Sequence, residues 1–265
     1  MPWVPLFVMP NLRVKEPVSL RQAAIVSPDD DRVRAYGRQY PQFRRFISKF
    51  RGPFGARCEP GIFLMQTRIR KSFRSIEAMS SFRDLVAISV IPLQRAKAMT
   101  HDGSFYTQYS DYFDFYPWTY NDRNGHLVCS SPALVGLDEV RSFRGQSSPV
   151  LSPQDLDSAD FDRPLLNQLL LHWQRRYGTA RPEWADLALF RSLNMAFAAS
   201  KIPAGIDTTQ FHIGRSIALW VSAFEILTHS GTDVRLFDVY ERIAALPWKE
   251  KATRHKRYKP HKWKK

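Results

Sequence analysis

The sequence predicts an α+β N-terminal half followed by an all-α C-terminal helical bundle, so that the protein is mainly helical overall. Short β-prone pieces separated by proline open the chain, whereas apolar residues recur at helical spacing from Asp162 onward. A long apolar helix is expected near the end of this second half. We therefore expect an α+β region at 1–150, a helical bundle at 160–248 and a basic disordered tail at 249–265.

The composition is that of a globular protein in a reducing environment. The 265 residues are 44% hydrophobic and 13% aromatic, which allows a substantial core. The two cysteines, Cys58 and Cys129, are too few for a disulfide framework or a zinc cluster. No run approaches the roughly 18 apolar residues of a membrane span, and the N-terminus does not read as a secretion signal. We expect a cytoplasmic protein with no membrane partner, no metal and no small-molecule cofactor.

The net charge of +14 is concentrated at the C-terminus. Residues 249–265 hold seven Lys and two Arg against Glu250, a net charge of +8, which leaves +6 for the rest of the chain. Such a tail is either a solvated extension or an electrostatic arm for RNA or DNA. If it is an arm, the candidate nucleic-acid-binding residues are Lys256, Arg257, Lys259 and Lys262.

The first elements are two strands and an interrupted helix. Strands are predicted at Val4–Val8 and Ala23–Val26. The carboxylates of Pro28-Asp-Asp-Asp31 are typical of a helix N-terminus; a metal-binding acidic trio, the alternative, lacks further ligands at suitable spacing. Apolar residues then recur at helical spacing from Val33 to Phe50, with a break at Pro41.

A buried strand is predicted at Gly61–Gln66, followed by a strongly patterned helix from Ser72 that ends before Pro92. Asn124-Gly125 predicts a tight turn that leads into a short strand. The Ser-rich and acidic segment 141–160 is interpreted as the linker between the halves.

Residues 105–120 contain nine aromatic side chains. Aromatic residues beside basic charge can stack on single-stranded bases, but the charged neighbours here are Asp102, Asp111 and Asp114. We therefore interpret these aromatics as strand and core residues.

Four helices are predicted after the linker. The first is capped by Asp162 and stopped by Gly178, and the second begins at Pro182. The third lies within 207–231 and the fourth runs from about Asp233 to Leu246. Helices with such short connections indicate a bundle.

The third helix is predicted to be the hub of this bundle. Asp207-Thr-Thr-Gln210 forms a capping box and Gly231 a stop signal. Leu219 and Ile226 lie on a second face, which indicates cover from more than one side. The predicted core-facing arc consists of Ile213, Ile217, Trp220, Phe224 and Leu227.

A polar stripe on the same helix holds the candidate catalytic residues Arg215, Glu225 and His229, together with Ser222. Glu225 and His229 are i, i+4 neighbours, so a hydrogen-bonded carboxylate could tune His229 for proton transfer. The alternative is an ordinary surface pair on a solvated or partner-facing edge. The sequence contains no Gly-rich phosphate loop, zinc motif or nucleophile elbow.

The segment Ala223-Phe-Glu-Ile-Leu227 resembles the second signature helix of the Apea-like HEPN family. Residues 191–196 and Pro247-Trp248 also resemble uncharacterised bacterial members, so that the resemblance covers 160–248. It implies a helical bundle that dimerises. Active members of that family are metal-independent RNases that use an Arg followed after four to six residues by His, so the resemblance implies that this motif is to be looked for here.

That catalytic motif is missing downstream of the signature helix. Arg95 to His101 and Arg254 to His261 match the spacing, but about two such matches are expected by chance; Arg123-Asn-Gly-His126 has the wrong spacing. We therefore expect a HEPN-like protein, truncated before its catalytic motif and non-catalytic in this form, that acts through protein or RNA association. One alternative is a metal-independent endoribonuclease that uses the tail, and another is a basic nucleic-acid-binding protein with a Lys-rich C-terminal arm.

Overall fold

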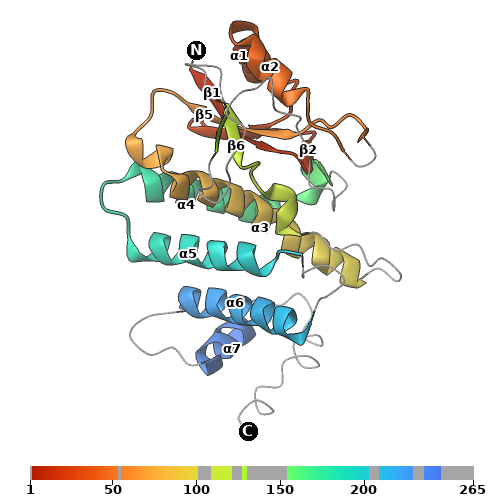
Figure 1. Cartoon of the computed structure of the whole chain (residues 1–265). Coiled ribbons are helices and arrows are strands. Elements are labelled where there is room, and N and C mark those ends of the chain that lie inside the picture. The colour runs from red at the N-terminus through yellow and green to blue at the C-terminus, as the bar shows by residue number, and fades with distance from the viewer. Residues whose placement is uncertain are drawn as a thin grey trace. The chain divides into compact units, whose positions relative to one another are not determined.

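The computed structural model divides the chain into two compact units, residues 1–181 with 200–202, and residues 182–199 with 203–265 (Figure 1). The residues that the structure describes are 2–52, 55–100, 109–120, 127–129, 154–202, 209–228 and 236–245. The first unit contains an antiparallel sheet with helices, and the described part of the second is helical. The predicted combination of an α+β first part and a helical second part is therefore present in this form.

A four-stranded sheet organises the first unit. Its strand order is β1–β5–β4–β3, and every neighbouring pair is antiparallel. The four strands are β1 (Trp3–Met9), β5 (Gly61–Gln66), β4 (Ala23–Val26) and β3 (Val18–Ser19). The strands predicted at 4–8, 23–26 and 61–66 are confirmed.

Helices α1 (Asp31–Gln39) and α2 (Pro41–Ile47) cover one face of this sheet. The side chain of Asp30 accepts a hydrogen bond from the Arg32 amide at 2.9 Å and so caps α1. Pro41 occupies the first turn of α2, where its missing N–H is not needed. The predicted helix start and the break at Pro41 are both confirmed.

The opposite face of the sheet packs against α3 (Ile76–Thr100), which in turn packs against α4 (Arg163–Gly178). The Phe63 ring of β5 lies 5.8 Å from the Phe82 ring of α3, and Phe82 lies 5.0 Å from the fully buried Trp173 of α4. The Trp173 indole donates a hydrogen bond to the Ala78 carbonyl at 2.9 Å. Asp162 caps α4 by accepting from the Leu165 amide at 3.1 Å, as predicted.

The predicted end of the α3 helix before Pro92 is wrong, because α3 continues through Pro92 to Thr100. Its last turns are held by the short helix η4 (Ser158–Asp160): Gln94 donates to the Asp160 carboxylate at 2.9 Å and Lys97 to the Ala159 carbonyl at 2.9 Å. These tertiary contacts offset the loss of the backbone hydrogen bond that proline cannot donate.

Part of the predicted linker at 141–160 is structured. The strand β8 (Gln154–Leu156) pairs in parallel with β2 (Leu12–Val14), and η4 follows it. The first unit therefore continues through α4, whereas the sequence placed residues 160–178 with the C-terminal helices.

Four further short elements lie among the described residues of the first unit. They are η2 (Lys71–Arg74), η3 (Ser110–Phe113) and the antiparallel strands β6 (Trp118–Tyr120) and β7 (Leu127–Cys129). The predicted short strand after the turn corresponds to β7, while Asn124-Gly125 itself lies outside the described residues.

The second unit contains α5 (Trp184–Ala199), α6 (Gln210–Thr228) and α7 (Leu236–Ala245). The Ser192 hydroxyl donates to the Ala223 carbonyl at 2.7 Å, and the Ser216 hydroxyl donates to the Ala199 carbonyl at 2.6 Å. These two bonds fix an antiparallel register between α5 and α6. Ala188 and Ala196 share a stripe with Ser192 and Ala199, and small side chains allow two helices to approach closely.

The prediction that α6 buries the arc from Ile213 to Leu227 is wrong. The exposed fractions are 46% for Ile213, 59% for Ile217, 40% for Phe224 and 46% for Leu227. The face that packs on α5 lies about 100° further around the helix, where Ser216 and Ala223 lie with Leu219 and Ile226. The small residues and hydroxyls of that second face, rather than the most apolar arc, determine how α6 packs on α5.

The ends predicted for α6 and the tail lie outside the described residues, as do Asp207, Gly231 and Pro247-Trp248. None of the described helices combines the length and apolar character that a bilayer span requires.

Removing the Ser192 hydroxyl should loosen the α5–α6 pair. We expect Ser192→Ala to lower the free energy of unfolding by about 1 kcal/mol, because a buried hydroxyl-to-carbonyl hydrogen bond is lost. Urea unfolding followed by far-UV circular dichroism measures this change. Ser222→Ala on α6 is the matched control and should have little effect; equal losses in both variants would contradict the proposed role of Ser192.

Candidate anion-binding site

The polar stripe predicted on α6 is present only in part among the described residues. Arg215 is exposed and Glu225 is half-buried, and no hydrogen bond or ion pair joins these two side chains in the described part of the chain. His229 lies outside the described residues, as do Lys256, Arg257, Lys259 and Lys262. The proton-transfer pair and the basic arm therefore stay predictions.

A second concentration of positive charge lies in the first unit. Residues 32–58 contain eight Arg or Lys and no Asp or Glu, a net charge of +8. Residues 1–248 carry a net charge of +6, so residues 1–31 and 59–248 together carry −2. A sequence search for long segments without carboxylates would have found this region. The comparison of residues 249–265 with the rest of the chain did not show it, because the basic residues of 32–58 are averaged with acidic residues elsewhere.

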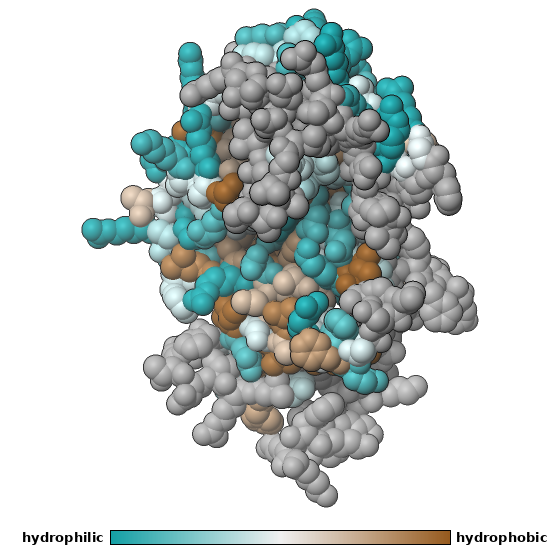
Figure 2. Space-filling model, in the orientation of Figure 1, coloured by the Kyte–Doolittle hydropathy of each residue, from teal (hydrophilic) through white to brown (hydrophobic). Residues whose placement is uncertain are grey.

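The basic segment folds into α1, α2 and the loop that follows them. Its apolar members, such as Tyr36, Phe43 and Phe46, are buried against the sheet. Its basic side chains lie on the outer side, and Figure 2 shows this end of the first unit covered by hydrophilic residues. The exposed basic residues are Arg34, Arg38, Arg44, Arg45, Arg51 and Arg57.

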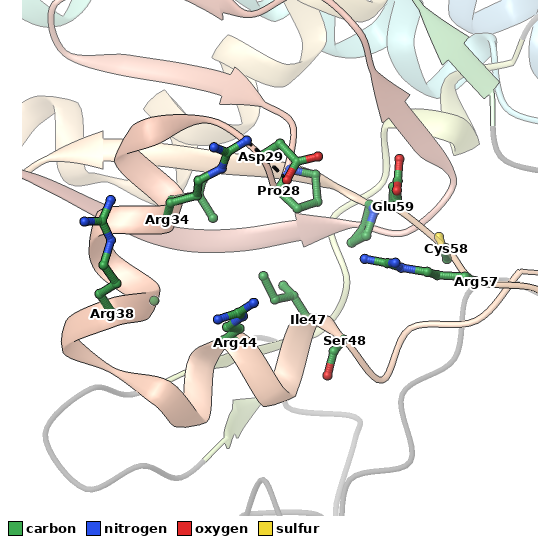
Figure 3. Close-up of a pocket in the computed structure, with 13 residues that line it drawn as sticks. Pro28, Asp29, Arg34, Arg38, Arg44, Ile47, Ser48, Arg57, Cys58 and Glu59 are labelled. Carbon is green, nitrogen blue, oxygen red and sulfur yellow. Dashed lines mark ion pairs between the residues drawn. The ribbon is translucent and has the colours of Figure 1, made fainter.

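A cavity of about 380 Å³ lies between α1, α2 and residues 57–60 (Figure 3). Four arginines line it, Arg34 and Arg38 from α1, Arg44 from α2 and Arg57 from the loop. In Figure 3 the Arg57 side chain extends toward α2, and Arg44 rises from α2 on the other side of the same space. The remaining lining includes the carboxylates Asp29 and Glu59 and the apolar side chains Pro28, Val33, Ile47 and Pro60.

The cavity carries an excess of positive charge. Its four arginines and two carboxylates give a formal net charge of +2. Arg34 pairs with Asp29 at 3.5 Å, but both side chains are largely exposed, so the pair contributes little. Among the residues that the structure describes, Arg38, Arg44 and Arg57 have no side-chain hydrogen bond or ion-pair partner. Three guanidinium groups are therefore available to an anion.

Local structure positions these arginines. Arg32 donates two hydrogen bonds of 2.8 Å to the Asp30 carboxylate, which lowers the pKa of Asp30 and fixes the first turn of α1. Arg34 and Arg38 are then i, i+4 neighbours on one face of α1. A Cβ atom added to Gly37 would lie 3.7 Å from the Cβ of Arg44, so α1 and α2 are close together where they meet the cavity.

The loop returns Arg57 to the helices through a tight turn. An antiparallel bridge joins Arg51 and Arg57, and the Gly52 amide donates to the Ala56 carbonyl at 2.8 Å. Gly55 has a φ of +78°, a left-handed conformation that glycine adopts without strain.

Cys58 also lines the cavity but is not a nucleophile at neutral pH. Its thiol donates to the Pro10 carbonyl at 3.1 Å, and burial raises its pKa to about 11. No cluster of His, Cys, Asp and Glu suited to a metal ion occurs within the described ranges. The side chains present at the cavity are those of an anion-binding site.

Stability should fall at high pH because two buried groups and one partly buried group retain their protons in the folded state. Burial raises the pKa of Cys58 from 9.0 to about 11, and those of Tyr116 and Tyr177 from 10.0 to about 12. The unfolded chain ionises these groups first and releases more protons, so the contribution to stability is complete below pH 9 and is lost between about pH 9 and 12. Urea midpoints measured from pH 8 to 11 should decrease, and Cys58→Ala should reduce the slope. A constant midpoint would contradict this assignment.

Comparison of the chain with protein-family models, with curated proteins and with solved structures finds no match.

Proposed function

We propose that this protein binds RNA without cleaving it, and that the outer surface of α1 and α2 contacts the phosphate backbone. The observation that supports this proposal is the net charge of +8 on residues 32–58, whose basic side chains lie outward while the apolar ones are buried. Arginine presents a planar fork of donors that matches phosphate oxygens, and the exposed basic residues of this surface are all arginine.

We further propose that the C-terminal helices form a HEPN-like module that lacks the catalytic Arg/His motif. The resemblance at 223–227 favours RNA over DNA, because RNA is the substrate of the active members of that family. In this proposal the protein acts by association, and α5 to α7 contribute protein contacts.

Binding through α1 and α2 should depend on salt and on specific arginines. The double variant Arg44→Ala/Arg45→Ala should weaken binding of a single-stranded RNA about tenfold or more at 0.1 M salt. It should also reduce the slope of log K against log salt concentration by about 1.4, since two phosphate contacts are lost. Fluorescence anisotropy of a labelled 12-mer measures both quantities.

The control Arg21→Ala/Arg68→Ala removes the same charge from exposed positions elsewhere in the first unit and should leave the slope nearly unchanged. Deletion of 249–265 tests the basic-arm alternative. If the deletion abolishes binding and the Arg44/Arg45 variant does not, the tail is the RNA-binding element. Cleavage of the RNA in EDTA, lost on His261→Ala, would instead establish the endoribonuclease alternative.

A second candidate function, self-association, is favoured by the exposed apolar arc of α6. This arc runs along a 19-residue helix and contains no charged side chain. Figure 2 shows apolar residues gathered over the helices of the second unit. We propose a second copy of α6 as the partner, because an uncharged stripe along a helix matches its own copy across a twofold axis, the commonest symmetry of soluble oligomers.

The oligomeric state should respond to the exposed arc of α6. Light scattering after size-exclusion chromatography should give the mass of a dimer for the natural protein and of a monomer for Ile217→Asp, because the substitution buries an unpaired charge in the interface. Ala218→Asp is the matched control, since it adds the same charge at an exposed neighbouring position that points elsewhere, and it should remain dimeric. The measurement is made at concentrations on the order of 1–100 μM, which is the range of ordinary dimer affinities. If the natural protein is monomeric throughout this range, self-association is contradicted.

A further inference from the structure

The cavity between α1, α2 and residues 57–60 differs from the rest of the arginine-rich surface because it is concave and holds carboxylates as well as arginines. Its volume of about 380 Å³ lies at the lower end of the range for small-molecule sites, which begins near 300 Å³. Such a space accommodates one nucleotide. It does not accommodate several consecutive nucleotides of a strand.

We propose that this cavity binds the terminal phosphate monoester of a nucleotide, either free or at the end of an RNA strand. The inference extends the proposed function, since the strand end is that of the bound RNA, but the free nucleotide tests it separately.

The charge of the cavity matches a monoester better than a diester. A phosphate monoester carries about −1.5 to −2 at pH 7, whereas each diester of a nucleic-acid backbone carries −1. The formal charge of the lining is +2, and three of its arginines have no side-chain partner among the described residues. The site therefore neutralises one dianion without a large residual charge.

The arrangement of the arginines also favours a terminal phosphate. Arg44 and Arg57 approach the space from α2 and from the loop opposite, while Arg38 lies further along α1 (Figure 3). A terminal phosphate offers three oxygens that are free to accept hydrogen bonds, so guanidinium forks can bind it from more than one direction. A diester offers only two such oxygens and must keep both ends of its strand clear of the walls.

The rest of the lining suits the nucleoside. The Asp29 and Glu59 carboxylates lie along one side of the cavity, with Arg44 on the other (Figure 3). Carboxylates accept hydrogen bonds from ribose hydroxyls or exocyclic amines and repel phosphates, which directs the single phosphate away from them and toward Arg44. Val33 and Ile47 are buried residues whose side chains provide an apolar wall for the sugar and base.

The test compares ligands that differ only in the terminal phosphate. Binding of three 12-mer RNAs, with a phosphate at the 5′ end, at the 3′ end or at neither, is measured by competition with a labelled RNA. AMP and adenosine are titrated separately by calorimetry. We expect a phosphorylated RNA to bind at least about tenfold more tightly than the unphosphorylated one, and AMP to bind in clear preference to adenosine.

Two single variants separate the cavity from the surface around it. Arg44→Ala should abolish the preference for the phosphate, because Arg44 lines the cavity. Arg45→Ala, an exposed neighbour on α2 that does not line the cavity, should weaken all three RNAs equally and keep the preference. Thermal unfolding of both variants should give midpoints close to that of the natural protein, because both substitutions are at exposed positions.

The outcomes distinguish this inference from the proposed function. Equal binding of all three RNAs, together with equal binding of AMP and adenosine, overturns the inference and leaves RNA binding in place. Preferential binding of AMP without any binding of RNA supports the cavity as a free-nucleotide site and overturns the proposed function. A phosphate preference that survives in Arg44→Ala also overturns the assignment to this cavity.

Discussion

The burial of β5 on both of its faces is the constraint on which the first unit depends. Ile62 and Leu64 face the cluster formed with α1 and α2, while Phe63 faces α3. A strand in this position needs helical cover on both sides, so the apolar face of α1 and α2 is used mainly against the sheet. The polar residues of these helices must then lie outward, and in this chain nearly all of the charged ones are arginine. The basic surface is thus a direct consequence of how the sheet is covered.

Signals that are local in the sequence predicted the elements well. The capping residues Asp30 and Asp162 and the break at Pro41 were all predicted, because each acts on backbone groups within one helical turn. The continuation of α3 past Pro92 was not predicted, since it depends on η4, which lies some 60 residues away in the chain. Periodicity identified the apolar arc of α6 and a second covered face with Leu219 and Ile226, but it assigned the core to the arc, whereas α5 packs on the second face. An apolar stripe indicates where burial is favourable, whereas close packing on α5 is determined by small residues such as Ser216 and Ala223.

The candidate site was less accessible to sequence reasoning than the fold. Arg38, Arg44 and Arg57 lie on three different elements, and only the break at Pro41 and the turn at Gly55 bring them to one cavity. No short motif records such an arrangement. The segment without carboxylates was visible in the sequence, but its charge alone does not predict a concave site. The residues chosen from the sequence, Arg215 and Glu225, share a helix and are not joined by a hydrogen bond within the described residues.

The parallel pairing of β2 with β8 has a consequence for how the protein is made. Leu12 pairs with Gln154, so the first of these strands leaves the ribosome long before its partner is synthesised. At ordinary translation rates the delay is on the order of 10 s, during which the edge of β2 is without that partner. The first unit also needs Trp173 of α4 to complete its core. Its native assembly is therefore a late event in synthesis, and the nascent N-terminal strands expose unpaired edges until their partners are made.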